Sequence, residues 1–198
     1  MNCPHCKYNN SKNYLQYCEK CGKILPINTS NYFDIFAIAE SFEVDLPGLE
    51  KRLYALQALN HPDKFIQASI KEKDISTHNS SIINQGYKVL KNVHRRAEYM
   101  LKLNEIDISH NTPSVQMLEE AMEWREKLGN LKNESEIKDL LEEITKLELQ
   151  KLNLIREKFA KKLYTEAQEV YININFINRF KQEIEKQLNS SQSSLDIQ

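Results

Sequence analysis

Apolar residues three and four positions apart run through most of the chain and predict a mainly helical fold. In the first half, a short apolar face over residues 32–36 precedes a leucine stripe over 46–56 and a longer stripe over 83–101. Ser30 and Asp45 lie just before the first two stripes and are candidate helix caps. The two longer stripes therefore predict an antiparallel helical hairpin, entered through a short first helix.

The second half has its own helical pattern. Polar residues over 104–112 interrupt the stripes and predict a linker. Thr112 is placed to cap a first helix over 113–128, and two further apolar stripes follow. Residues 113–188 therefore predict an antiparallel three-helix bundle. Residues 189–198 are rich in Ser, Gln and Asn, which predicts a disordered tail.

Composition supports an all-α fold and narrows the classes of partner. The 198 residues include 40% hydrophobic residues but only four glycines and five prolines, which favours long helices. Lys and Arg total 27 against 28 Asp and Glu, so the chain lacks the basic excess of a nucleic-acid-binding protein. No apolar run reaches the ~18 residues of a membrane span. We expect a cytoplasmic protein, with a mitochondrial matrix form as the alternative.

Four cysteines in the first 21 residues form a candidate metal site. They occur as two Cys-x2-Cys pairs, Cys3 with Cys6 and Cys18 with Cys21, and two such pairs can supply four thiolates to one tetrahedral ion. Zinc is the expected metal, in a structural role, because a short segment without an apolar core folds through its metal. His5 would be redundant as a ligand, and we expect it in solvent.

Other interpretations of the cysteines stay open. The same four thiolates suit rubredoxin-like iron. Two disulfides are the alternative for a secreted chain, and the sequence begins with no secretory signal. A redox pair would need a thioredoxin-like strand and helix beside it.

The tetrapeptide His61-Pro62-Asp63-Lys64 follows directly on the leucine stripe and is the clearest functional signal. Pro62 removes an N–H and pushes His61 out of the α region, so the helix must stop there. The polar residues then lie at the bend of the predicted hairpin. No nucleophile paired with a base, phosphate loop or open metal site accompanies them, so we expect a contact surface and a protein that is not an enzyme.

This arrangement resembles the J domain, the module by which co-chaperones engage DnaK-class chaperones. Its HscB branch, which serves iron-sulfur cluster assembly, is indicated by three further segments: Ile83-Asn84-Gln85, Arg96-Ala97-Glu98-Tyr99-Met100-Leu101 and Trp124-Arg125-Glu126-Lys127-Leu128. The resemblance implies a tetracysteine zinc-ribbon-like module over 1–28, a J domain over 29–103 and a C-terminal bundle over 113–188.

The resemblance also implies partners. His61, Pro62, Asp63 and Lys64 would contact a DnaK/HscA-class chaperone and stimulate its ATPase, with Asp63 as the main contact. Lys51 and Arg52 would also take part in chaperone binding. Many J proteins carry basic residues just before the histidine, but here only these two supply positive charge to that helix, so electrostatic steering should be weaker than in the general family.

A second apolar line marks the first helix of the bundle. Leu118 and Met122 lie one position beyond the core stripe and are bordered by acidic residues. The pattern alone favours a wide core stripe with a solvated acidic flank. The resemblance implies instead a binding site for an IscU-type scaffold, in which the matching residues are Leu118, Met122, Glu123, Glu126 and Phe176. A general J-domain co-chaperone for unfolded or other clients is the competing hypothesis.

Overall fold

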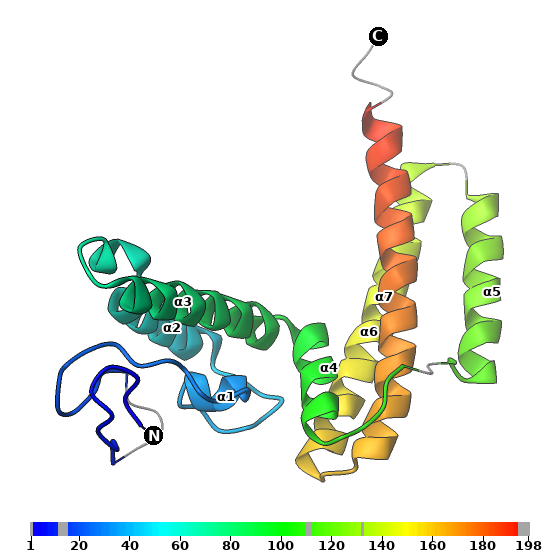
Figure 1. Cartoon of the computed structure of the whole chain (residues 1–198). Coiled ribbons are helices and arrows are strands. Elements are labelled where there is room, and N and C mark those ends of the chain that lie inside the picture. The colour runs from blue at the N-terminus through cyan, green and yellow to red at the C-terminus, as the bar shows by residue number, and fades with distance from the viewer. Residues whose placement is uncertain (1, 12–15, 110–111, 132, 194–198) are drawn as a thin grey trace. The chain divides into compact units, whose positions relative to one another are not determined.

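The computed structural model describes residues 2–11, 16–109, 112–131 and 133–193. It divides into two compact units, Met1–Arg96 and Ala97–Gln198. Over the described residues, regular structure is helical apart from two isolated antiparallel bridges, Asn2 with Asn9 and Tyr17 with Ile24 (Figure 1). The predicted all-α class is therefore confirmed. Within the same residues, none of the helices has the length and apolar content that a membrane crossing requires.

The first unit contains the predicted hairpin. A short helix, α1 (Tyr32–Ile35), leads into α2 (Leu46–Asn60), a 3-10 turn, η1 (Pro62–Phe65), and α3 (Ile70–Lys91). Helices α2 and α3 lie side by side (Figure 1). Helix α2 stops where Pro62 requires, because His61 has an extended backbone with φ −63° and ψ 129°.

Helix ends in the first unit differ in detail from those predicted. The cap of α1 is Asn31, whose side chain accepts a hydrogen bond from the Phe33 amide. The predicted cap at Ser30 is therefore wrong. Asp45 occupies the cap position of α2, but its side chain makes no capping hydrogen bond. The predicted long third helix is two helices, because the extended backbone of Asn92 separates α3 from α4 (Val93–Leu103) and its side chain accepts from Arg95 N.

A close approach of α1 to α3 completes the core of this unit. A Cβ atom at Gly86 would lie 2.9 Å from the Tyr32 ring and 3.1 Å from the Phe36 ring, so only glycine leaves room for α1. At the end of the unit Arg96 is buried, donates hydrogen bonds to the carbonyls of Phe42 and Leu90, and lies over the Phe42 ring. Desolvation lowers the pKa of Arg96, and the charge of Glu43 opposes that shift.

The second unit includes the last residues of α4 and, as predicted, a bundle of α5 (Val115–Asn130), α6 (Glu134–Ala160) and α7 (Tyr164–Ser193). One core joins all three helices, and within it the Trp124 ring stacks on Phe180 at 5.6 Å. Helix α5 is capped by Ser114, not Thr112, because the Ser114 hydroxyl accepts from the Met117 amide. It continues through Gly129. Helix α7 extends to Ser193, so the backbone is helical over 189–193, where a disordered tail was predicted.

Candidate partner-binding and metal sites

The tetrapeptide forms a polar tip at the bend between α2 and α3. His61 caps η1: its Nδ1 accepts from the Asp63 amide at 3.3 Å and lies 3.6 Å from Asp63 Oδ2. Lys64 folds back, and its Nζ donates to the Ala58 carbonyl at 2.6 Å, near the end of α2. The Asp63 side chain is 79% exposed. Asp63 therefore presents an exposed carboxylate on a turn whose backbone is held by His61 and Lys64.

Both ends of the tip are anchored in the protein interior. Asn60, directly before it, is 0% exposed, and its carbonyl accepts from the hydroxyls of Ser76 and Ser80 on α3. Phe65, directly after it, is 8% exposed and packs with Ile75. Sequence reasoning missed these anchors, although Ser76 and Ser80 lie on the α3 face that continues to the buried Ile83. That spacing was the available signal.

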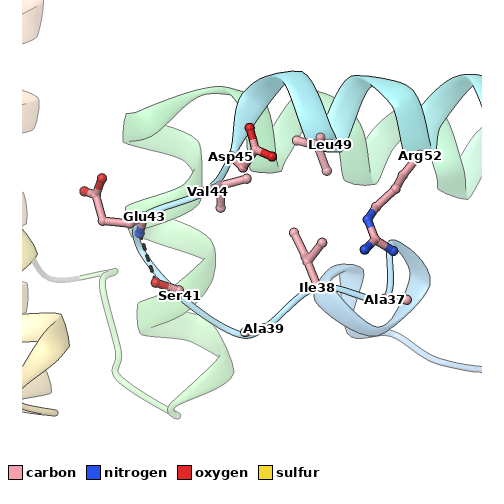
Figure 2. A pocket seen from close by; sticks show the side chains of 10 residues that line it. Ala37, Ile38, Ala39, Ser41, Glu43, Val44, Asp45, Leu49 and Arg52 are labelled. Atoms are coloured by element: carbon pink, nitrogen blue, oxygen red, sulfur yellow. Dashed lines mark hydrogen bonds between the residues drawn. The ribbon is translucent and has the colours of Figure 1, made fainter.

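The two basic residues of α2 do not form one basic surface beside the tip. Lys51 is exposed. The Arg52 side chain points back toward the segment after α1, where its Nη1 donates to the Phe36 carbonyl at 3.0 Å (Figure 2). In the same hollow, the Ser41 hydroxyl accepts from the Glu43 amide at 3.1 Å (Figure 2). Part of the donor capacity of Arg52 is thus used within the unit.

The four cysteine sulfurs converge as the spacing predicted. All lie within 4.8 Å of one another, and the pairs Cys3–Cys21 and Cys6–Cys18 are 3.7 Å apart. A disulfide needs about 2.05 Å, and the four cysteines are free thiols. The disulfide alternative is therefore wrong for this structure. Four convergent sulfurs fit a divalent ion that accepts a tetrahedral thiolate shell.

Two similar turns aim the sulfurs. The Lys7 amide donates to the Cys3 carbonyl at 3.0 Å, and the Gly22 amide donates to the Cys18 carbonyl at 2.9 Å. Lys7 and Gly22 have the same left-handed backbone, with φ 64° and 68°. Each Cys-x2-Cys pair is therefore the start of one turn of common geometry.

The thiols differ in acidity. Burial acts to raise the pKa of Cys18, but hydrogen bonds from the amides of Cys21 and Lys20 outweigh it and lower that pKa to about 6. For Cys21, a backbone bond from Lys23 acts to lower the pKa, while burial and the neighbouring sulfurs raise it to about 12. The Cys18 thiol therefore ionises readily, and the Cys21 thiol beside it resists ionisation. A bound cation would favour the ionised form of both.

Two expectations about this segment need correction. His5 is not in solvent: it is half-buried, and its Nε2 is fully buried with no hydrogen-bond partner among the described residues. The segment also has an apolar core, because Leu25 is 1% exposed and packs on Cys3 and Cys18. The metal is therefore not its only source of packing energy.

The outer face of α5 is exposed, contrary to the wide core stripe that the pattern favoured. Met122 is 69% exposed and Leu118 is 38% exposed, while Met117, Ala121 and Trp124 fill the core on the other side. Glu119, Glu123 and Glu126 are exposed around them. The sequence prediction missed Val115, which is 73% exposed and one turn before Leu118 on the same face. Phe176 is half-buried against the bundle core.

A shallow acidic groove of about 620 Å³ runs between α5 and α6. Its carboxylates are Glu120, Glu123, Asp139, Glu142 and Glu143, and Trp124 also lines it. Two ion pairs offset part of this charge: Lys127 with Glu143 at 3.2 Å and Lys146 with Glu142 at 2.8 Å. A hydrogen bond and the charge of Lys146 lower the pKa of Glu142. The groove shares Glu123 with the outer face of α5.

Known proteins share this arrangement. The chain is similar to the crystal structure of human co-chaperone protein HscB, with a TM-score of 0.89 and 28% identity over 94% of this chain and 98% of the human one. A curated co-chaperone protein HscB homolog of Shewanella denitrificans is 30% identical over 164 residues, which cover 78% of this chain and 94% of the relative. Its counterpart in Shewanella frigidimarina is 38% identical over 117 residues, covering 58% and 67%.

These likenesses, together with the hairpin and bundle, define the class of the protein as a co-chaperone with a J-domain-like helical fold. A family model described as the HSCB C-terminal oligomerisation domain matches residues 114–185, which cover most of the bundle. The chain belongs to the HscB family of co-chaperones.

Proposed function

We propose that the protein binds an IscU-type iron-sulfur scaffold through its bundle and presents it to a DnaK/HscA-class chaperone, whose ATPase its hairpin tip stimulates. The observation that carries the proposal is the exposed carboxylate of Asp63, on a turn whose backbone His61 caps at the bend of a J-domain-like hairpin. A solvent-facing anion on an ordered turn suits pairing with an arginine of the partner chaperone. The protein itself supplies no hydrolytic chemistry in this role.

An ATPase measurement tests the chaperone half of the proposal. Asp63→Asn keeps the size of the side chain and removes its charge, so it should lower stimulation of the chaperone's ATPase by roughly tenfold or more, as losing one partner of an interfacial charge pair does. Asp74→Asn on α3 is the matched control, because Asp74 is also an exposed aspartate of the hairpin. Equal stimulation by the two variants would refute this half of the proposal.

The scaffold site is proposed on the outer face of α5. Leu118 and Met122 supply exposed apolar area, and Glu123 and Glu126 supply negative charge that would select a basic partner. The acidic groove beside it extends the same charge toward α6. Phe176 is half-buried in the bundle and would contribute through the edge that remains accessible.

Affinity measurements with matched variants test the scaffold site. The double variant Leu118→Ala, Met122→Ala should weaken scaffold binding by roughly thirtyfold, since each truncation removes about 1 kcal/mol of apolar contact. The control is Leu149→Ala, Leu154→Ala on α6, whose side chains are 58% and 37% exposed, close to the values for the test pair. If both variants bind as the wild type does, the alternative gains: a general J-domain co-chaperone whose clients do not use α5.

Zinc is the metal that we propose for Cys3, Cys6, Cys18 and Cys21. Four free thiols within 4.8 Å of one another support it, and iron in the same shell is distinguished by the absorption of the purified protein. Bound zinc would cross-link the two turns and offer no reactive position, because the four cysteines would take all four positions of its shell.

The bacterial origin of the curated relatives supports a cytoplasmic location, with the mitochondrial matrix as the alternative.

A further inference from the structure

The cysteine module, defined as residues 2–11 and 16–28, lies against the end of the hairpin that carries the tip. On one side, the Tyr17 hydroxyl donates to the Leu59 carbonyl at 2.6 Å. Next to it, the side-chain Nδ2 of Asn60 donates to Gln16 Oε1 at 2.8 Å. The module therefore contacts the last two residues of α2, immediately before His61.

On the other side of the tip, the contact is apolar and ionic. Ile24 is 1% exposed and packs with Phe65 and Ile75, so the residue that follows Lys64 is held by the module. Lys23 forms an ion pair with Glu72 at 3.2 Å. Lys71 Nζ donates to the Pro4 carbonyl at 2.7 Å, within the first cysteine turn.

A buried asparagine connects these contacts. Asn79 on α3 is 0% exposed and uses both ends of its side chain. Its amide nitrogen donates to the Leu25 carbonyl and to Asn60 Oδ1, each at 2.8 Å, and its oxygen accepts from the Ile27 amide at 2.9 Å. Through Asn79, the module and the residue before the tip share one hydrogen-bond network.

We propose that the metal-loaded cysteine module is a positioning element for the tip, with Tyr17 and Asn79 as its positioning residues. This inference rests on the proposed function, because the tip matters only if it engages a chaperone. Tyr17 precedes the ligand Cys18 and bridges to Ile24, so metal binding fixes the backbone that carries both contacts. Loss of the metal frees that backbone and loosens residues 61–65.

Amide hydrogen exchange of the full chain tests the coupling without reference to a partner. Removing Zn²⁺ with a chelator should speed exchange over residues 61–65 by at least about tenfold, while exchange in α6 and α7 stays unchanged. Tyr17→Phe in the zinc-loaded chain should speed exchange over the same residues by about fivefold, the effect of one lost hydrogen bond. The control is Tyr8→Phe, the same chemical change at a tyrosine of the module that is 41% exposed.

Unchanged exchange over 61–65 in both the zinc-free chain and Tyr17→Phe would overturn the inference. If the zinc-free chain unfolds, as far-ultraviolet circular dichroism would show, Tyr17→Phe decides alone, because it keeps all four ligands. An equal response to Tyr8→Phe would also overturn it, since the effect would then belong to the module in general.

The ATPase separates this inference from the proposed function. A looser tip should raise the concentration of co-chaperone that gives half-maximal stimulation, by about threefold for Tyr17→Phe, while the maximal rate stays the same. A fall in the maximal rate alone contradicts a positioning role.

If the wild type stimulates no DnaK-class chaperone, the proposed function fails, and hydrogen exchange still decides whether the module and the tip are coupled. If Asp63→Asn abolishes stimulation while Tyr17→Phe changes nothing, the proposed function holds and the inference fails.

Discussion

Replacing Asn79 by alanine removes the side chain at the centre of the contact between the cysteine module and the hairpin. Alanine is an excellent helix former, so the backbone of α3 should keep its conformation. The main effect of the substitution is therefore the loss of hydrogen bonds. It leaves three groups without their partner: the Leu25 carbonyl, the Ile27 amide and Asn60 Oδ1.

The magnitude follows from those three bonds. A buried hydrogen bond contributes about 1 kcal/mol net, so the variant should lose about 3 kcal/mol of unfolding free energy in the first unit. Asn79 and Asn60 are both 0% exposed, so water offers little replacement. That loss corresponds to about a hundredfold in the folding equilibrium.

Urea titration of the zinc-loaded chain is the assay. Circular dichroism follows both units, whereas fluorescence of Trp124, the single tryptophan of the chain, follows the bundle. Asn79→Ala should shift the dichroism transition and move the Trp124 transition much less. Asn84→Ala is the matched control on the same helix. Asn84 is exposed and accepts a hydrogen bond from Gln57 at 2.8 Å, so this variant should cost about 0.5 kcal/mol. A loss below about 1 kcal/mol for Asn79→Ala, or one equal to the control's, would refute the reasoning.

Three further predictions concern other parts of the structure. Gly86→Ala should destabilise the first unit by about 2 kcal/mol, because the new Cβ would meet the Tyr32 ring. Gly129→Ala should stabilise α5 by about 0.7 kcal/mol, because the space around Gly129 is open and alanine is the better helix former. Urea unfolding measures both changes. Trp124→Ala should cost the bundle about 4 kcal/mol by thermal unfolding followed by circular dichroism. Hydrogen bonds from Ser69 and then Lys23 lower the pKa of Glu72 from 4.5, so the ionised Glu72 stabilises the fold above pH 4.5, and this stabilisation is lost as the pH falls through the lower pKa of the folded state. Because Gln carries no such charge, Glu72→Gln should lose less unfolding free energy than the wild type below pH 4.5. An equal loss in the two proteins would contradict this prediction.

Much of the fold could be predicted from local patterns. Proline fixed the end of α2, leucine spacing identified the hairpin, and the paired cysteines identified four converging sulfurs. Each depends on residues close in sequence. The line of Leu118 and Met122 was visible as a second apolar stripe, but the stripe alone could not say whether these side chains are buried in the core or exposed.

The remainder depends on contacts between distant residues. Asn60 and Asn79 look like surface asparagines in the sequence, but both are buried and bonded to the cysteine module. Asn60 donates to Gln16, and Asn79 bonds to Leu25 and Ile27. The division of the long third helix at Asn92 depends on a side-chain bond to the Arg95 amide that competes with helix continuation. The Arg52 side chain points toward the segment after α1 because it donates to the Phe36 carbonyl, which lies sixteen positions earlier in the sequence.

The matched backbones of Lys7 and Gly22 bear on the order in which the metal site assembles. A left-handed conformation costs a residue with a Cβ about 1 kcal/mol, and glycine adopts it without that cost. The turn of Cys18 and Cys21 therefore reaches its bound shape at a lower conformational cost than the turn of Cys3 and Cys6. Metal capture should begin at the second turn and finish at the first, so the chain folds around its ion from residue 18 back toward its N-terminus.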